Sequence, residues 1–154
     1  MPGGRKLPTR AELSTWREFI ETTERLRATV STRLHEDTGL SPGDYVVLLA
    51  LTEATDGRKR SSDLAAHIGW ERSRLSHHLA RMERRGLIRR QECATDSRGA
   101  EVVIKKAGAD AFHAATAPHL RAVRELFVDA LTPEQLAAAA DIAAALRRHL
   151  AQDL

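Results

Sequence analysis

The segment from Ser61 to Ile104 constrains the fold most, because several local patterns follow one another there with little room between them. Two helical patterns meet at Gly69, and the second, about Glu71 to Arg85, is followed by Gly86. Two short runs of strand-forming residues then flank a turn-forming stretch at 95–99. A short helix, a four-turn helix and an antiparallel hairpin in this order are typical of a winged helix-turn-helix. The four-turn helix has apolar residues on one face, at Leu75, Leu79 and Met82.

Local start signals predict two further helices. Ser41 is an N-cap candidate, with Pro42 at the first helical position and Asp44 three residues after the cap. The apolar run YVVLLALTEA that follows predicts a centrally buried helix. Thr132-Pro133-Glu134-Gln135 repeats the start pattern before an alanine-rich helix. The apolar stripe of that last helix is thin and consists of Leu136, Ala140, Ala143, Leu146 and Leu150.

The remaining helices follow from apolar spacing. A pattern from about Ala11 to His35 predicts a long amphipathic helix, and the helical pattern returns from Lys105. We expect Pro118 to kink or interrupt this later helix, because proline lacks a backbone donor and crowds the preceding turn. The predicted fold is therefore mainly α with a small antiparallel β-wing, containing about six helices and two to three short strands.

Basic residues are concentrated in the middle of the chain. The formal net charge is only +3 over 154 residues, but residues 58–98 contain eleven basic and five acidic residues, a net of +6. The remainder is therefore at −3. A positive segment inside an acidic remainder is the electrostatic pattern of a nucleic-acid-binding region. The alternative is a solvated basic face without a partner.

The helix at 71–85 has the composition expected of a helix in the DNA major groove, which is wide enough to admit one. Arginine can donate two hydrogen bonds to guanine, and hydroxyl or imidazole groups can donate to bases or phosphates. The residues predicted to face the groove are Arg72, Ser73, Arg74, Ser76, His77 and Arg81. Simple solvent exposure of this face is the alternative.

A second polar cluster comes just before these helices. We expect it to contact the DNA backbone, and either of its serines can also cap the short third helix. The cluster consists of Arg58, Lys59, Arg60, Ser61 and Ser62.

The predicted hairpin carries Asp96, Arg98 and Gly99 near its tip. A wing beside a major-groove helix meets the adjacent minor groove, where the narrow width of A·T-rich DNA attracts an inserted arginine. Arg98 is the candidate for that role, Asp96 can orient its guanidinium, and Gly99 can relieve the backbone. Without this context, the pattern is an exposed ion pair in a tight turn.

These features together resemble the MarR family of bacterial transcription regulators. The resemblance lies in the order of the elements, in SDLAAHIGWERSRLSHHLARMERRGLIRR, and in DSRG at the Asp-x-Arg-Gly wing motif of the family. It spans roughly residues 11–151 and is most specific over 61–104.

The resemblance implies an obligate homodimer that binds double-stranded DNA at a pseudo-palindromic operator. It implies a flexible N-terminal arm at 1–10, a helical dimerisation domain built from 11–38 and 105–154, and a winged helix-turn-helix DNA-binding domain at 39–104. It also implies a small aromatic or lipophilic effector that releases DNA. The expected function is sequence-specific transcription regulation, more often repression, without a cofactor.

Several residues allow more than one interpretation. Trp16 can stack on a planar ligand and His35 is a second pocket candidate, but a first-helix tryptophan is more often a dimer-core residue. A metal site built on His35, His113 and His119 is disfavoured. His113 and His119 are six residues apart, and side chains at this spacing do not share a helix face. Cys93 is expected to be structural rather than redox-active.

The residues also bear on two other function classes. A catalytic pair at Ser76-His77 is excluded, because adjacent helical side chains point about 100° apart. A winged helix that binds only proteins remains the alternative, and steep salt dependence of binding to duplex DNA separates it from a DNA-binding protein. No apolar run is long enough to cross a bilayer and no secretion signal is recognised, so a cytoplasmic location is expected.

Overall fold

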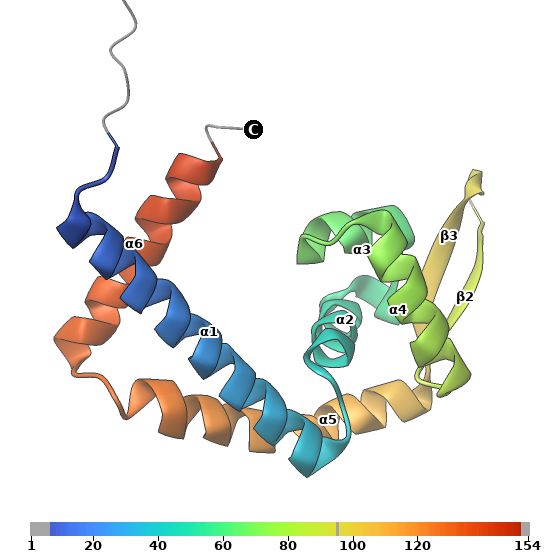
Figure 1. Ribbon diagram of the computed structural model, residues 1–154. Coiled ribbons are helices and arrows are strands. Elements are labelled where there is room, and N and C mark those ends of the chain that lie inside the picture. Colours follow the sequence, from blue (N-terminus) through green and yellow to red (C-terminus); the bar gives the residue numbers. More distant parts are fainter. Residues whose placement is uncertain (1–6, 95, 152–154) are drawn as a thin grey trace, which may run out of the picture. The chain divides into compact units, whose positions relative to one another are not determined.

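The computed structural model describes residues 7–94 and 96–151, without the side chains of residues 96–98. Helices predominate, with one small sheet, and none of the helices in this part of the chain is long and apolar enough to span a membrane. In chain order the elements are α1 (Arg10–Thr38), α2 (Pro42–Glu53), η1 (Thr55–Gly57), β1 (Arg58–Arg60), α3 (Ser61–Ile68), α4 (Arg72–Arg84), β2 (Ile88–Cys93), β3 (Asp96–Ile104), α5 (Lys106–Val123), η2 (Arg124–Val128) and α6 (Pro133–Leu150) (Figure 1).

The chain divides into two compact units. One comprises Ser31–Ala122 and is called here the winged unit. The other comprises the chain up to Val30 and from Val123 onward, and is called the helical unit. The mainly helical fold with a small antiparallel sheet, as predicted, is confirmed.

The core of the winged unit is built around α2, as the apolar run in this helix predicts. Leu48 and Leu51 of α2 are fully buried, together with Leu64 of α3 and Met82 of α4. Figure 1 shows α2, α3 and α4 gathered beside the hairpin of β2 and β3. The apolar face of α4 therefore anchors that helix to the core and leaves the opposite face to solvent.

The sheet has the order β1-β3-β2 and is antiparallel throughout. The pairs Ile88↔Ile104 and Glu92↔Ala100 set the register of the hairpin, which shifts between Glu92 and Cys93. β3 begins at Asp96, so the expectation that 95–99 form a turn is wrong for the last four of these residues. They belong to the strand that pairs with β2 across the register shift.

The predicted helix starts are mostly confirmed. Ser41 and Asp44 form a reciprocal capping box at the start of α2, and Thr132 and Gln135 form another at the start of α6. The prediction that a serine caps α3 is wrong: Arg60 occupies the N-cap without a side-chain hydrogen bond, and both serines lie inside the helix. β1 pairs up to Arg60, so the strand passes directly into the helix.

Two glycines allow the turns after α3 and after α4. Gly69 ends α3 with φ of 70°, and Gly86 follows α4 with φ of 73°. This left-handed conformation is strained for other residues, which explains glycine at both sites.

The expected interruption of α5 at Pro118 is wrong, since the helix runs unbroken from Lys106 to Val123. The regular helix gives way only afterwards, to a π-helical turn over Arg124–Val128. A proline inside a helix removes one backbone hydrogen bond, and α5 continues in spite of that loss.

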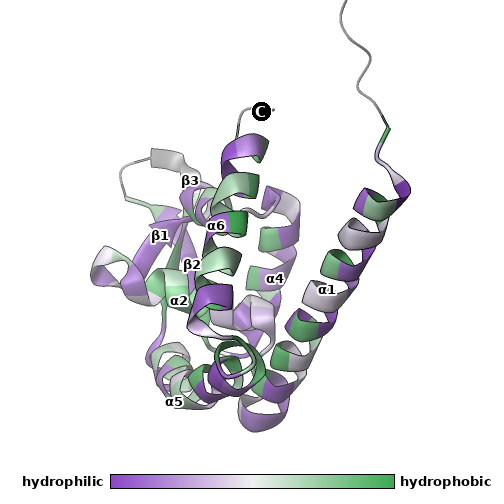
Figure 2. Cartoon of the chain, turned by 90° about the vertical axis from the view of Figure 1, so that its left-hand side faces the viewer, coloured by the Kyte–Doolittle hydropathy of each residue, from purple (hydrophilic) through white to green (hydrophobic). Residues whose placement is uncertain are grey.

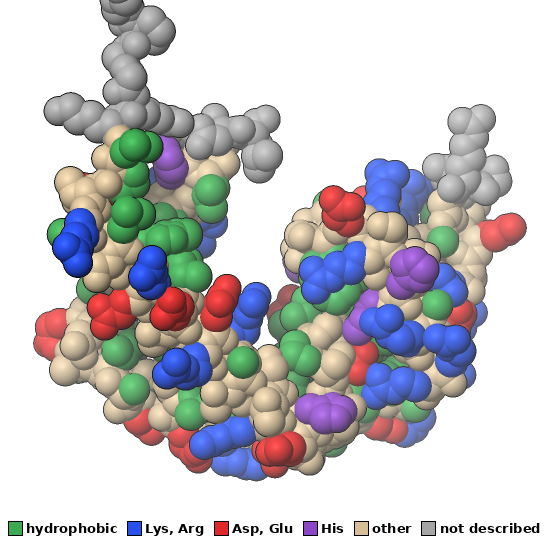
Figure 3. All heavy atoms as spheres, in the orientation of Figure 1, with side chains coloured by type: hydrophobic (Ala, Val, Ile, Leu, Met, Phe, Trp, Pro, Cys, Tyr) green, Lys and Arg blue, Asp and Glu red, His purple; other side chains and the backbone are tan. Residues whose placement is uncertain are grey.

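The helical unit contains no buried residue among those that the structure describes in it (7–30 and 123–151). Along α1 and α6, hydrophobic residues alternate with hydrophilic ones, as the colours of the two helices show (Figure 2). Phe19 is 43% exposed, Ile142 47% and Leu146 48%. A groove of about 820 Å³ runs between α1, η2 and α6, and green side chains mark it in Figure 3. Of the predicted α6 stripe, Ala143 and Leu146 line this groove.

Candidate nucleic-acid interface

The exposed face of α4 is the most distinctive surface of the winged unit. Because an α-helix turns by 100° per residue, Ser73, His77, Ala80 and Arg84 fall within an arc of about 60°. Leu75, Leu79 and Met82 lie on the opposite side and are buried. Ser73, His77 and Arg84 are exposed. The polar stripe of α4 therefore points away from the core along the length of the helix.

Arginines flank this stripe on both sides. Arg72 and Ser76 lie on the edge that faces α3 and the sheet, while Arg74 and Arg81 lie on the opposite edge. All four side chains are exposed. Basic side chains and histidines gather over this part of the winged unit in Figure 3. These four residues were all predicted to face the groove, and the structure places them on two edges of the helix.

Arg84 was missed by the sequence analysis. It lies eleven residues after Ser73, three helical turns along the same face, and its side chain is exposed. Helical spacing alone could have identified it, because i, i+4, i+7 and i+11 share a face.

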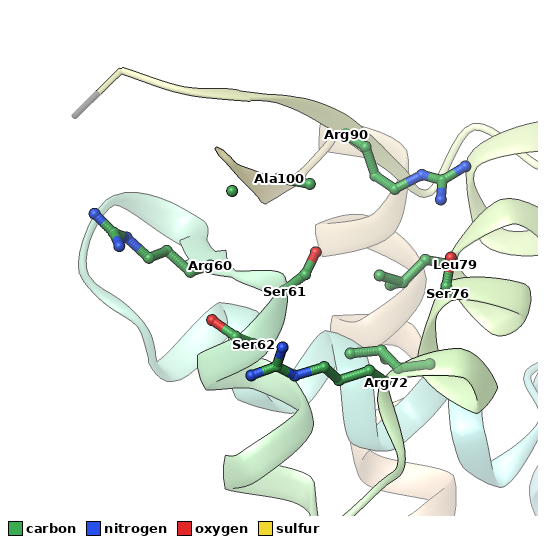
Figure 4. A pocket seen from close by; sticks show the side chains of 10 residues that line it. Arg60, Ser61, Ser62, Arg72, Ser76, Leu79, Arg90 and Ala100 are labelled. Atoms are coloured by element: carbon green, nitrogen blue, oxygen red, sulfur yellow. The ribbon is translucent and has the colours of Figure 1, made fainter. Parts of the chain in front are cut away.

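A cleft of about 400 Å³, lined by basic and polar side chains and by Leu75 and Leu79, opens between the first turn of α3, the edge of α4 and the sheet. Arg72 points from α4 toward Ser62 at the start of α3, and Arg60 lies at the far end (Figure 4). The remaining lining includes Ser61, Ser76, Arg90, Gly99 and Ala100. Free backbone N–H groups at a helix start and several guanidinium groups favour an anion, so the cleft is chemically suited to a phosphate.

The strands around the cleft neutralise part of its basic charge. Arg58 approaches Glu101 at 3.7 Å, and Arg90 pairs with Glu83 of α4 at 3.0 Å. The backbone N–H of Arg90 also donates to Glu83, and these contacts hold the pKa of the Glu83 carboxyl below its usual range. Arg90 therefore fixes the hairpin to α4, a role that its sequence position did not indicate.

A buried carboxylate anchors the other edge of α4. Asp44, only 2% exposed, accepts a hydrogen bond from Arg85 Nη1 at 2.6 Å and another from the Ser41 backbone N–H at 3.0 Å. His78 Nε2 lies 3.0 Å from its other oxygen. Burial by itself would raise the pKa of Asp44, but the contacts with His78, Arg85 and Ser41 outweigh it and hold this pKa far below the usual range.

The wing residues are only partly described. Asp96 and Arg98 lie in β3, but their side chains fall outside the described residues, so their predicted minor-groove roles remain predictions. Gly99 is half-buried and lines the cleft next to Ala100.

The other candidate residues belong to other elements of the chain. Trp16 is 61% exposed on α1 in the helical unit, and His35 is exposed in the winged unit. His119 packs against the Tyr45 ring at 4.5 Å between centroids, and burial lowers its pKa. Across residues 7–94 and 96–151 no three metal-ligating side chains come together. Cys93 is buried at the end of β2.

Comparison with known proteins assigns the family. The sequence model of the MarR family matches residues 38–99. AbsC, a MarR family transcriptional regulator from Streptomyces coelicolor, is 32% identical, with 96% of this chain and 99% of that chain covered and a TM-score of 0.87. The chain belongs to the MarR family.

Two further solved structures extend the comparison. Sco3205, a MarR family regulator from S. coelicolor solved in complex with DNA, is also 32% identical, with 96% and 92% of the two chains covered and a TM-score of 0.90. MOSR from M. tuberculosis, likewise solved with DNA, is 25% identical, with 90% and 97% covered and a TM-score of 0.71. No protein with a curated description matches the sequence significantly. Members of this family are transcription regulators and not enzymes, so the exclusion of catalysis is confirmed.

Proposed function

We propose that this MarR family protein is a homodimeric, sequence-specific DNA-binding regulator that acts as a repressor. The observation that carries the proposal is the exposed stripe of α4, Ser73, His77 and Arg84, which projects from a helix whose opposite face is buried. A helix anchored in this way presents a rigid set of donors to the major groove.

The two edges of α4 have different roles in this proposal. Arg74 and Arg81 contact base edges together with the exposed stripe, whereas Arg72 faces the cleft at the start of α3. We propose that Arg60, Ser61 and Ser62 hold a backbone phosphate in that cleft together with Arg72. Phosphate contacts fix the position of the protein on the duplex, and base contacts supply the specificity.

The salt dependence of binding tests DNA recognition against a protein-binding role for the winged helix. If Lys59, Arg60 and Arg72 of both protomers each neutralise one phosphate, six contacts give a slope of log K against log salt of about −5. The measurement is fluorescence anisotropy with a duplex selected from a random-sequence pool. A failure to enrich any duplex, or a slope near zero, would favour the protein-interaction module.

The wing has its own test. We propose that Arg98 enters the minor groove beside the α4 site, so Arg98→Ala should weaken binding most when the flanks are A·T-rich. Arg89→Ala is the matched control, because Arg89 is an exposed arginine on the neighbouring strand, where it donates to Gln91. Equal binding of Arg98→Ala and the parent protein at moderate salt contradicts the wing role.

The homodimer is proposed because the helical unit lacks a core of its own. Its described residues include no buried side chain, and the groove between α1, η2 and α6 is lined mostly by apolar side chains. Exposed apolar surface of this extent destabilises an isolated unit in water and is buried by association. A second copy of the chain offers the same surface, so a symmetric pairing can bury both.

A charge placed in the groove tests this pairing. Leu146→Glu should shift the sedimentation coefficient from dimer to monomer at micromolar concentration, because the groove lining would carry a charge that cannot be buried unpaired. Ala137→Glu introduces the same charge on the opposite side of α6 and should leave the dimer intact. A monomeric parent protein, or an unaffected Leu146→Glu dimer, would refute the pairing.

A small aromatic or lipophilic effector is proposed to release the DNA. RdhR, a regulator of the same fold, has been solved in its 2,4-dichlorophenol-bound form, and this phenol is a suitable first probe. Trp16, 61% exposed, and His35 are the candidate ligand contacts. Titration of the preformed DNA complex with the phenol should release the duplex from the parent protein and less from Trp16→Ala. No release at saturating phenol argues against effectors of this class.

The operator is proposed to contain two half-sites about one helical turn (~10 bp) apart. Sequencing of DNA fragments bound by the protein across its genome would show the spacing directly. Derepression of the adjacent genes when the regulator is deleted is the expected result for a repressor, and their loss of expression would identify an activator.

A further inference from the structure

Two arginines at one edge of α4 contact aromatic side chains that are not part of the exposed stripe. The guanidinium carbon of Arg74 lies 4.2 Å above the centre of the Trp70 ring. Arg81 Nη2 lies 3.0 Å from His78 Nδ1. Long basic side chains on a helix surface ordinarily sample many rotamers, so two such contacts on neighbouring turns restrict the edge considerably.

The two aromatic groups also contact each other. Trp70 and His78 meet edge to face, with ring centres 5.3 Å apart and planes at 86°. Trp70 occupies the turn between α3 and α4, where its backbone N–H donates to Ala65. His78 is 8% exposed on the inner side of α4. Each ring therefore supports the other as well as one arginine.

Asp44 lies next to the His78 ring. An arginine has donors only, so its contact with Nδ1 requires that nitrogen to be unprotonated and places the proton of the neutral ring on Nε2. Nε2 faces Asp44 Oδ1 at 3.0 Å. Asp44 is itself held by the start of α2 and by Arg85. The chain of contacts thus runs from the cap of α2 to the edge of α4.

The backbone of α2 is fitted closely to this cluster. A Cβ atom added to Gly43 would lie 2.7 Å from His78 Cε1 and 2.9 Å from Trp70 Cη2. Real side chains do not approach so closely, so only glycine leaves room for the two rings in this position. The backbone of α2 and the contact between the two rings therefore both restrict the positions of Trp70 and His78.

We propose that Trp70 and His78 are positioning residues for DNA recognition, which hold the guanidinium groups of Arg74 and Arg81 in place before DNA binds. The inference rests on the proposed DNA-binding function and assigns a role to residues that do not touch DNA. An arginine that is already held in place loses less conformational freedom on binding than a mobile one. The protein therefore binds DNA with higher affinity and base selectivity. The higher affinity applies to DNA that carries the bases contacted by these arginines, and not to phosphate contacts elsewhere.

The test uses the full-length protein and the duplex that the parent protein selects from a random pool. Trp70→Leu removes the aromatic face but keeps apolar bulk, and should weaken binding to this duplex by about three- to thirtyfold. Binding to a scrambled duplex of the same composition should change by about twofold at most, because it depends on phosphate contacts. Trp70→Phe retains a ring and should recover part of the loss.

A double-mutant cycle distinguishes positioning from a general structural effect. On an Arg74→Ala background, Trp70→Leu should weaken binding less than it does in the parent protein, because only its support of His78 and Arg81 is then lost. On an Arg72→Ala background its full effect should persist. Single base substitutions in the duplex should show that Trp70→Leu and Arg74→Ala relax selectivity at the same base pair.

The outcomes separate the inference from the function on which it depends. If the parent protein selects no duplex, DNA recognition itself fails. If it selects one, two results would show that the positioning role is wrong. The losses of binding affinity from Trp70→Leu and Arg74→Ala would be additive, or the two variants would lose selectivity at different base pairs. Should Trp70→Leu not fold, Trp70→Phe replaces it in the same cycle. Phenylalanine binds a guanidinium more weakly than tryptophan does, so the effect of Trp70→Phe must still be coupled to Arg74→Ala and not to Arg72→Ala.

Discussion

Replacing Asp44 by alanine tests the claim that one buried carboxylate joins the start of α2 to α4. The substitution removes the acceptor of the Ser41 N–H, and loss of such a cap costs about 1 kcal/mol. It also removes the 2.6 Å charge-assisted bond from Arg85 and leaves His78 without its acidic neighbour. The Arg85 side chain is 45% exposed and can be rehydrated, so the full penalty for an orphaned buried charge does not apply. We expect a total loss of about 3 kcal/mol in the free energy of unfolding.

The assay is thermal and urea unfolding at equal protein concentration, since the stability of a dimer depends on concentration. For a chain of this length, 3 kcal/mol corresponds to a decrease in Tm of about 6–12 °C. Ser41→Ala is the matched control, because it removes only the hydroxyl that accepts from the Asp44 N–H and leaves the carboxylate in place. Its cost should be about 1 kcal/mol.

The pH dependence gives an independent check. The pKa of Asp44 in the folded protein lies below its value in the unfolded chain, so the stabilisation is fully present above the ordinary aspartate pKa of about 4. It is lost progressively as the pH falls below that value. The stability difference between the parent protein and Asp44→Ala should therefore be smaller at pH 3 than at pH 7. A difference that does not narrow, or a loss at pH 7 no larger than that of Ser41→Ala, would refute the reasoning.

Three further predictions concern single side chains. Gly108→Ala would drive its Cβ into the Leu87 carbonyl oxygen, so we expect a loss of about 1–3 kcal/mol in urea unfolding, and wild-type stability would contradict this close packing. Thr132→Ala removes the hydroxyl that accepts from the Gln135 N–H at the start of α6, and calorimetry should show a loss of about 1 kcal/mol. Arg84→Ala should weaken binding to the selected duplex in anisotropy measurements while leaving Tm unchanged, and unaltered affinity would exclude Arg84 from the interface.

Many local elements could be predicted because their causes lie within a few residues. The capping boxes at Ser41 and Thr132 depend on a side chain and a backbone N–H three positions away, so the sequence contains both partners. The buried face of α4 follows from helical periodicity in the same way. Prediction failed at three sites, where the surrounding elements override the preference of single residues. α5 continues through Pro118, β3 already begins at Asp96, and Arg60 rather than a serine occupies the N-cap of α3.

By itself, the sequence determined which elements form, in what order, and which face of α4 is polar. Only the tertiary structure decided how that face is arranged. It placed Arg85 on a carboxylate 41 positions earlier in the chain and Arg74 over Trp70, and it turned Arg72 toward the start of α3. The physical reason is that caps and amphipathic faces depend on neighbours along the chain. An ion pair or a stacked guanidinium depends on the packing of α2 and α3 against α4, which no local pattern records.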